Sequence, residues 1–282
     1  MVIEYPHFDG VRLRLDIAYV GTSYHGWQIQ TKPVTVQGEL RDHLSRLLGR
    51  PVVPVAAGRT DSGVHARGQV AHLTVRNSDE AERVARALPR MCDGDIQVLN
   101  VRRVSPDFNA RFSAQSRRYA YHLGFGRDVF YPYRWYVYQP VEPALMDQAA
   151  RDFLGKHDFT SFCKAASLKA AGNFCEVSHC AFEWGANSAI LHVKANRFLH
   201  HMVRNIAGML VEIGRGELPV DAVPRALEAK SRRAIGRMAP AKGLFLEEVE
   251  YPEQLLDPGY WDPNGYRVRQ ALLNVPTPRS DP

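Results

Sequence analysis

Apolar and polar residues alternate one by one in most of the strands that this sequence predicts, and this alternation restricts the fold more than any other feature. In residues 12–19, the apolar side chains are Leu13, Leu15 and Ile17, with charged residues between them. Successive side chains of a strand point to opposite faces, so such a strand buries one face and leaves the other for solvent or a ligand. That pattern is typical of antiparallel sheets, whereas the doubly wound parallel fold uses continuously apolar strands.

Helical spacing separates these strands. Apolar residues recur at helical intervals over 36–48, before Gly49, and over 198–213, before Gly214. A helix capped by Ser78 is expected to stop before Pro89. Strands and helices alternate in two sets that meet near residues 108–118, which predicts an α+β fold with antiparallel or mixed sheets. We expect an N-terminal domain (1–110), a C-terminal domain (111–256) and a proline-containing tail (257–282).

The charge balance permits a nucleic acid partner without requiring one. Lys and Arg total 36 against 30 Asp and Glu, a formal net charge of +6 with a pI near 9.2. No apolar run approaches the roughly 20 residues of a membrane span, and the first ten residues lack the apolar core of a secretory signal. We therefore expect a cytoplasmic protein without membrane contact. Neither GxGxxG nor GxxxxGK[ST] occurs, which lowers the expectation of a nucleotide cofactor.

The four cysteines favour reduced, inert thiols. No CxxC occurs, and without a signal peptide the natural environment is a reducing cytosol. The alternative is a zinc site built from Cys163, Cys175, His179 and Cys180. However, Cys175 and Cys180 lie at the permissive edge of ligand spacing, and adjacent His179 and Cys180 would face opposite sides of a strand.

The glycine-bounded loop at the start of GRTDSGVHARGQVAHL (58–73) carries one candidate site. Arg59 and Asp61 can converge there, and a carboxylate that an arginine keeps charged can act as nucleophile or base. From spacing alone, an Arg–Asp pair that merely pins the turn is the favoured interpretation. Ser62 and His65 would suit a hydrolase, but the GxSxG nucleophile motif is missing.

A basic, aromatic stretch covers residues 101–121. Arginine binds phosphates and aromatic rings stack on bases, so this combination is typical of RNA binding. We expect Phe108 and Phe112 in the core and Tyr119 at the site, and Trp27 looks exposed in its own turn-rich loop. The arginines of the stretch are Arg102, Arg103, Arg111, Arg117 and Arg118.

The third stretch, NRFLHHMVRNIAG (196–208), combines an apolar helix face with His200, His201 and Arg204 beside it. Two adjacent histidines on a helix are too close together for an i, i+4 metal pair, so we expect no metal. Arg204 can cover the helix surface, or it can point into a cleft and pair with Asp61.

With these stretches in view, the chain resembles the TruA-type tRNA pseudouridine synthases, which modify nucleotides 38–40. The resemblance spans about residues 12–252. Its most specific motifs are GRTDSGVHA and HHMVRNIAG. The others are YVGTSYHGWQIQ, TVQGEL, FNARFSAQSRRYAY, HDFTSFC and APAKGLFLEEVEYP.

The resemblance implies two similar α+β halves whose sheets, with helices on one face, join into a continuous floor with a central basic cleft. It implies an isomerase that acts as a homodimer on uridine in the anticodon stem-loop of tRNA. Asp61 falls on the family's catalytic aspartate, Arg59 and Arg204 on arginines around it, and Tyr119 on the aromatic that stacks on the target base and accepts a ring proton. Further RNA contacts are expected from Arg111, Arg117, Arg118, His201 and Trp27.

One segment departs from the family pattern, because Cys175 stands where an arginine is expected. No RNA contact is therefore carried over for that strand. Pseudouridine formation exchanges no electrons and no external groups, so the resemblance implies no cofactor. Whether Asp61 attacks C1′, adds to C6 or removes a sugar proton stays open.

Three other functions compete with that of a synthase. An RNA-binding protein without chemistry is disfavoured because Asp61, Arg59, Tyr119 and Arg204 are all present. A nucleoside or glycoside hydrolase would use similar carboxylate chemistry but would release free base, and it explains the arginine-rich stretch poorly. A purely structural protein accounts for neither the loop nor the basic residues.

Overall fold

The computed structural model describes residues 10–92, 94–164, 167 and 172–256, which form two compact units. Unit 1 comprises residues 10–60, 66–114 and 249–256. Unit 2 comprises residues 61–65 and the described part of 115–248. The domain boundary expected between residues 110 and 111 stays a prediction, and the expected tail (257–282) lies outside the described residues.

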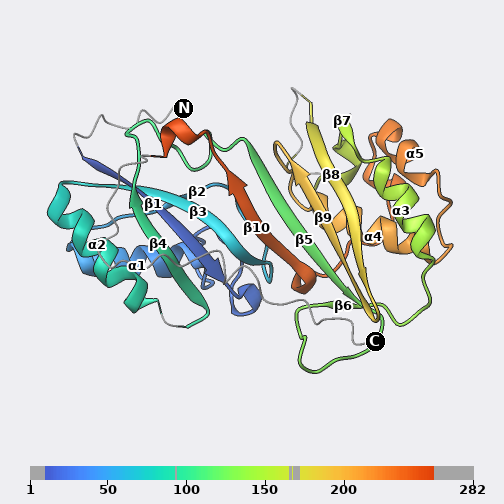
Figure 1. Cartoon of the computed structure of the whole chain (residues 1–282), viewed down its shortest axis with the longest axis horizontal. Coiled ribbons are helices and arrows are strands. Elements are labelled where there is room, and N and C mark those ends of the chain that lie inside the picture. Colours follow the sequence, from blue (N-terminus) through green and yellow to red (C-terminus); the bar gives the residue numbers. More distant parts are fainter. Residues whose placement is uncertain (1–9, 93, 165–166, 168–171, 257–282) are drawn as a thin grey trace. The chain divides into compact units, whose positions relative to one another are not determined.

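Unit 1 is built on an antiparallel sheet in the order β4-β1-β3 (Figure 1). Leu13, Leu15 and Ile17 of β1 are at most 1% exposed, which confirms the strand predicted from their alternation. The short β2 pairs with β3. The strands are β1 (Val11–Tyr19), β2 (Val55–Ala56), β3 (His65–Val75) and β4 (Ile96–Arg103).

Two helices, α1 (Val36–Leu48) and α2 (Ser78–Met91), complete unit 1. Gly49 ends α1 in the left-handed conformation, as its position predicts. The prediction for α2 was wrong at both ends: Asn77 caps the helix, and the helix runs through Pro89. Proline lacks an N–H and loses one helical bond, but the N–H of Cys92 still donates to Leu88 and closes the last turn.

In unit 2 the strands follow the order β10-β5-β9-β8-β7 (Figure 1). The pairs β5–β9, β9–β8 and β8–β7 are antiparallel, and the short β6 pairs with β5 in parallel. The β8–β9 hairpin expected from the sequence is confirmed. The strands are β5 (Ser116–Gly124), β6 (Trp135–Tyr136), β7 (Gly155–Asp158), β8 (Phe174–Gly185), β9 (Ser188–Ala195) and β10 (Leu244–Glu250).

The helices of unit 2 are α3 (Pro143–Arg151), α4 (Met202–Gly214) and α5 (Ala222–Ala229). Helix α4 packs against α3 and β5. It begins four residues later than its apolar pattern predicted, because His201 has a left-handed backbone with φ 71° and cannot continue a helix. Short 3₁₀ turns occur at Gly21–Ser23, Thr160–Phe162, Arg232–Ala234, Ala241–Gly243 and Glu253–Leu255.

The antiparallel pairings and the helices confirm the α+β class. The similarity of the two halves and a central basic cleft stay predictions. None of the helices in the described part of the chain is long and apolar enough to span a membrane.

The four cysteines are buried free thiols, which confirms the interpretation drawn from their spacing. Burial raises the pKa of Cys175 to about 11 and that of Cys180 to about 12. His179 is exposed beside buried Cys180, so the two do not share a face of β8. Cys175, which stands where the family pattern has an arginine, is 1% exposed, so its thiol is not accessible at the surface of β8.

Candidate active site

Asp61 lies in a tight turn that leads into β3. The N–H of Val64 donates to the carbonyl of Asp61 at 3.1 Å and closes the turn. Gly63 has φ 76°, a left-handed conformation that glycine adopts without strain. The glycine after Ser62 thus lets the chain reverse at Asp61 while the Asp61 side chain stays only 18% exposed.

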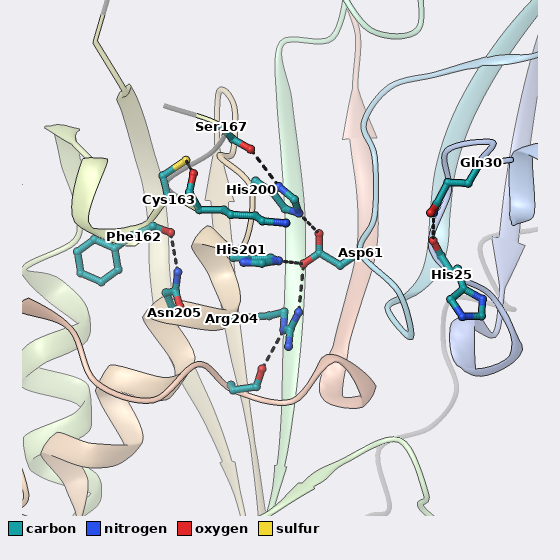
Figure 2. Close-up of polar contacts among 12 residues, drawn as sticks. His25, Gln30, Asp61, Phe162, Cys163, Ser167, His200, His201, Arg204 and Asn205 are labelled. Carbon is teal, nitrogen blue, oxygen red and sulfur yellow. Dashed lines mark hydrogen bonds and ion pairs between the residues drawn. The ribbon is translucent and has the colours of Figure 1, made fainter. Parts of the chain in front are cut away.

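Three side chains converge on the Asp61 carboxylate from one short segment, His200 to Arg204 (Figure 2). Arg204 Nη1 lies 3.2 Å from Oδ2, and His201 Nε2 lies 3.6 Å from the same oxygen. His200 Nε2 lies 3.1 Å from the other oxygen, Oδ1. Both carboxylate oxygens are therefore held, and among the described residues the ion pairs of Asp61 come from these three.

The backbone around α4 explains how this segment reaches Asp61. His201 precedes the helix in its left-handed conformation, and Arg204 lies in the first turn. Arg204 Nε donates to the carbonyl of Ala239 at 2.8 Å, while the Ala239 N–H donates back to the Arg204 carbonyl at 3.1 Å. A Cβ on Gly208 would lie 1.9 Å from the Arg237 carbonyl oxygen, so only glycine permits this close approach.

A second set of contacts supports the cluster. Ser167 Oγ lies 3.1 Å from His200 Nδ1, and the Lys164 N–H donates to the His200 carbonyl at 3.1 Å. Asn205 Nδ2 donates to the Phe162 carbonyl at 2.7 Å and fixes the first turn of α4 from within the core. These contacts hold the segment that surrounds Asp61 from several directions.

The electrostatic environment of the cluster is positive. Partial burial lowers the pKa of His201, and the neighbouring basic groups, Arg204 and Lys164 among them, lower it further against the opposing effect of Asp61. His201 is therefore mainly neutral at neutral pH. The Asp61 side chain keeps 18% of its surface exposed, and its partners His201 and His200 are 21% and 38% exposed, so part of the carboxylate faces solvent.

The same group has ligand atoms of the kind that bind zinc. One atom each from Asp61, His200 and His201 lies within 4.8 Å of the others. The prediction that the histidines stand on a helix was wrong, so the reason given for expecting no metal does not hold. However, Arg204 already places a permanent positive charge at Oδ2, which disfavours a second cation there.

The other predicted site residues of unit 2 lie on β5. Tyr119 is 8% exposed and packs its ring edge against Phe198, with centroids 5.0 Å apart. Arg117 Nη1 donates to the carbonyl of Asn196, and Arg118 Nε lies 3.2 Å from Glu248 Oε2. All three are thus already held by the protein.

In unit 1, the expected exposure of two aromatic residues was wrong. Trp27 is 1% exposed, because its backbone bonds to Thr60 and Gln37 and its ring packs near Tyr19, and a ring buried in this way cannot stack on RNA. Phe112 is 79% exposed, whereas Phe108 is in the core as expected.

Two predicted arginines of unit 1 are exposed. Arg59 precedes Asp61 by two residues, and Arg111 holds its guanidinium carbon 5.4 Å from the centre of the Phe112 ring. His200 was noted beside Arg204 but was not predicted to be a site residue, and Ser167 was not noted at all. The adjacent histidines were visible, but their placement on a helix concealed that both reach one carboxylate.

Comparison with known proteins places this arrangement in a family. Residues 17–113 and 149–252 match the family model of tRNA pseudouridine synthases. The chain belongs to the tRNA pseudouridine synthase family. A tRNA pseudouridine synthase A of Moorella thermoacetica is 43% identical over 245 residues, which cover 85% of this chain and 99% of the relative. A tRNA pseudouridine synthase A of Bacteroides thetaiotaomicron is 41% identical over 245 residues, which cover 85% of this chain and 90% of the relative.

Among solved structures, a chain of a Cbf5–Nop10–Gar1 complex aligns with 71% of this chain and 45% of its own length. Its TM-score is 0.34 at 11% identity, which is too low to add to the assignment. Members of the tRNA pseudouridine synthase family are isomerases, so the family confirms the expected enzyme class and tRNA as the expected partner. This tRNA-modifying isomerase activity is favoured over a hydrolase, a binding protein or a structural protein.

Proposed function

We propose that Asp61 carries the chemistry of this pseudouridine synthase, on uridine at positions 38, 39 and 40 in the anticodon stem-loop of tRNA. The observation that supports the proposal best is the convergence of His200, His201 and Arg204 on one reachable carboxylate. A carboxylate with both oxygens oriented can act on a carbon or a proton at a defined place. The enzyme is proposed to work in the cytoplasm as a homodimer and without a cofactor.

The reaction balances without any other reactant. The bond between C1′ and N1 of uridine breaks, the uracil turns, and C5 joins C1′. N1 ends with a proton and C5 gives one up. The sugar carbon passes through oxocarbenium-like character, which a carboxylate stabilises or traps, as in glycoside cleavage. Addition of Asp61 to C6, or removal of a sugar proton, would use the same oriented carboxylate.

The proposed supporting roles follow from charge and ring chemistry. Arg204 orients Asp61, and Arg59, exposed two residues away, completes the positive surroundings. Tyr119 stacks on the target base and accepts its ring proton. Arg111, Arg117, Arg118 and His201 contact the RNA, whose target base must leave the stem at a cost of a few kcal/mol that phosphate contacts offset. Trp27 is left out of this set because it is 1% exposed, whereas Tyr119 keeps 8% of its surface exposed.

The test is tritium release from a tRNA transcript labelled at C5 of uridine, with wild type beside Asp61→Asn. We expect release by wild type without free uracil, no release by the variant, and similar RNA binding by both. A matched transcript with cytidine at positions 38 to 40 should release nothing. Release from that transcript would contradict the assigned positions, and release by Asp61→Asn would contradict the assigned residue. Free uracil would instead indicate a hydrolase.

A further inference from the structure

His200 contacts Asp61, but the proposed function assigns His200 no role of its own. Arg204 and His201 both reach Oδ2, whereas His200 Nε2 reaches Oδ1 at 3.1 Å. Both oxygens lie off the bond between Cβ and Cγ, so contacts at either one resist rotation of the carboxylate about that bond. Of these three side chains, His200 alone meets Oδ1. Its loss would leave Oδ1 without an ion-pair partner among the described residues and would let the carboxylate tilt about its contacts at Oδ2.

His200 is itself held on several sides. Its carbonyl accepts from the Lys164 N–H, its Nδ1 lies 3.1 Å from Ser167 Oγ, and its ring lies 4.1 Å from the His201 ring between centroids (Figure 2). When a neutral imidazole donates from Nε2, its Nδ1 can only accept. A donor from Nε2 to Asp61 and an acceptor toward the Ser167 hydroxyl thus require one and the same tautomer.

We infer that His200 is a positioning residue that orients Oδ1 of Asp61 for the reaction, and that Ser167 acts through His200 by fixing its ring and tautomer. The inference rests on the proposed role of Asp61. Groups one step removed from the chemistry matter because small misplacements of a reacting atom cost large factors in rate. His200 itself does not exchange a proton with the RNA in this scheme.

The experiment compares His200→Leu with His200→Gln. Leucine removes the donor, and we expect kcat to fall about 10-fold with KM within about twofold, because a partly exposed bond to a charged group is lost. Glutamine places an N–H donor near the position of the imidazole Nε2, so we expect kcat within about threefold of wild type. Recovery by glutamine is the signature of a donor to Oδ1, since a merely structural role would not follow donor chemistry.

Ser167 supplies a second, independent test. Ser167→Ala alone should lower kcat about threefold, because the ring loses its hydroxyl partner. In the His200→Leu background the same change should have no further effect, since Ser167 acts only through His200. Equal effects of Ser167→Ala in both backgrounds would overturn the relay.

A matched control is His192→Leu on β9. His192 Nε2 lies 3.2 Å from Glu183 Oε2, a similar histidine–carboxylate pair away from Asp61, and we expect unchanged kcat. Wild-type kcat in His200→Leu, a rise in KM alone, or equal loss in both His200 variants would overturn the positioning role. Inactive wild type on every tRNA tested would instead contradict the proposed function, and the inference about His200 would fall with it.

Discussion

Two carboxylates of this chain, Glu80 and Asp61, both pair with guanidinium groups but differ in exposure and in how far away in the sequence their partners lie. Glu80 of unit 1 is 8% exposed and lies 2.7 Å from Arg50 Nη2, while the Arg76 N–H donates to the same Oε2 at 2.9 Å. Asp61 of unit 2 is more exposed, and its three partners come from a segment more than 130 residues away in the sequence. Both carboxylates are paired, but only Asp61 is paired and open to solvent.

The difference indicates what each network does. Glu80 ties the chain after α1 to the first turn of α2, so every partner belongs to the segments that it joins. Burial alone would raise the pKa of Glu80, but the Arg76 N–H and the Arg50 guanidinium outweigh it and lower that pKa below its ordinary value of 4.5. A carboxylate buried among the segments that it joins stabilises the fold. Asp61 is more exposed than Glu80, which is the access to solvent that its proposed role requires.

Neutralising Asp61 should separate the two networks most strongly. We expect Asp61→Asn to lower kcat at least about 1,000-fold, because the amide is neither a nucleophile nor a base, while the midpoint of urea unfolding changes little. Single-turnover kinetics and urea titration measure the two effects on one preparation. A large loss of stability would mean that Asp61, like Glu80, mainly holds the fold.

The buried His72 of unit 1 should make the stability of the fold depend on pH. His72 is 7% exposed, and its Nδ1 accepts from the Ala110 N–H at 3.0 Å. Burial, with the nearby charge of Arg12, lowers the pKa of His72 from 6.5 to about 4. Protonation then favours the unfolded chain, so the contribution of His72 is complete above pH 6.5 and is lost as pH falls toward 4. The full loss is about 3 kcal/mol, at ~1.4 kcal/mol per pH unit.

His72→Asn provides the measurement, because Asn Oδ1 can still accept from Ala110 but does not titrate. Urea unfolding of both proteins at pH 7 and pH 4.5 should show a steeper loss of stability in the wild type. Parallel losses in the two proteins would show that His72 is not the group responsible.

Glu80→Gln should have the opposite effects to Asp61→Asn, because it should lower stability and leave kcat unchanged. We expect about 2 kcal/mol lower unfolding free energy at pH 7, since a buried charge-assisted pair is broken, and unchanged kcat. The pKa of Glu80 is lowered in the folded state, so the difference from wild type should shrink as pH falls below about 4.5. Asp79→Asn, at the neighbouring exposed position, is the control and should change stability little. A drop in kcat for Glu80→Gln would undermine the division between the two networks.

The spacing of apolar residues and glycines correctly predicted the elements whose form depends mainly on neighbouring residues in the sequence. Alternation identified β1, and the apolar spacing with Gly49 identified α1. The start of α4 was missed because the left-handed His201 is stabilised by its surroundings and leaves the apolar period unbroken. Exposure of Trp27 was misjudged for a similar reason, since its burial depends on contacts with Thr60, far along the chain.

The site shows the same limit more clearly. Asp61 and Arg204 are separated by 143 residues, so no spacing rule can pair them, and the sequence left Arg204 with two alternatives. Only the resemblance to a family singled out both residues. The roles proposed for His200 and Ser167 could not be predicted from the sequence, because they depend on which oxygen of Asp61 His200 meets and on the contact between Ser167 and the His200 ring.

The smallest expected effect is on kcat, and it concerns Arg204. Each of the two carboxylates pairs with an arginine, Glu80 with Arg50 and Asp61 with Arg204. Arg204 uses Nε for Ala239 and Nη1 for Asp61, a two-pronged geometry that lysine cannot reproduce. Arg204→Lys keeps the charge and leaves the histidine contacts in place, so we expect about 10-fold lower kcat, far less than for Asp61→Asn. Arg215→Lys, which changes an arginine paired with Glu217 just after the same helix, should leave kcat unchanged. Full activity of Arg204→Lys would mean that charge alone, rather than the forked geometry, holds Asp61 in place.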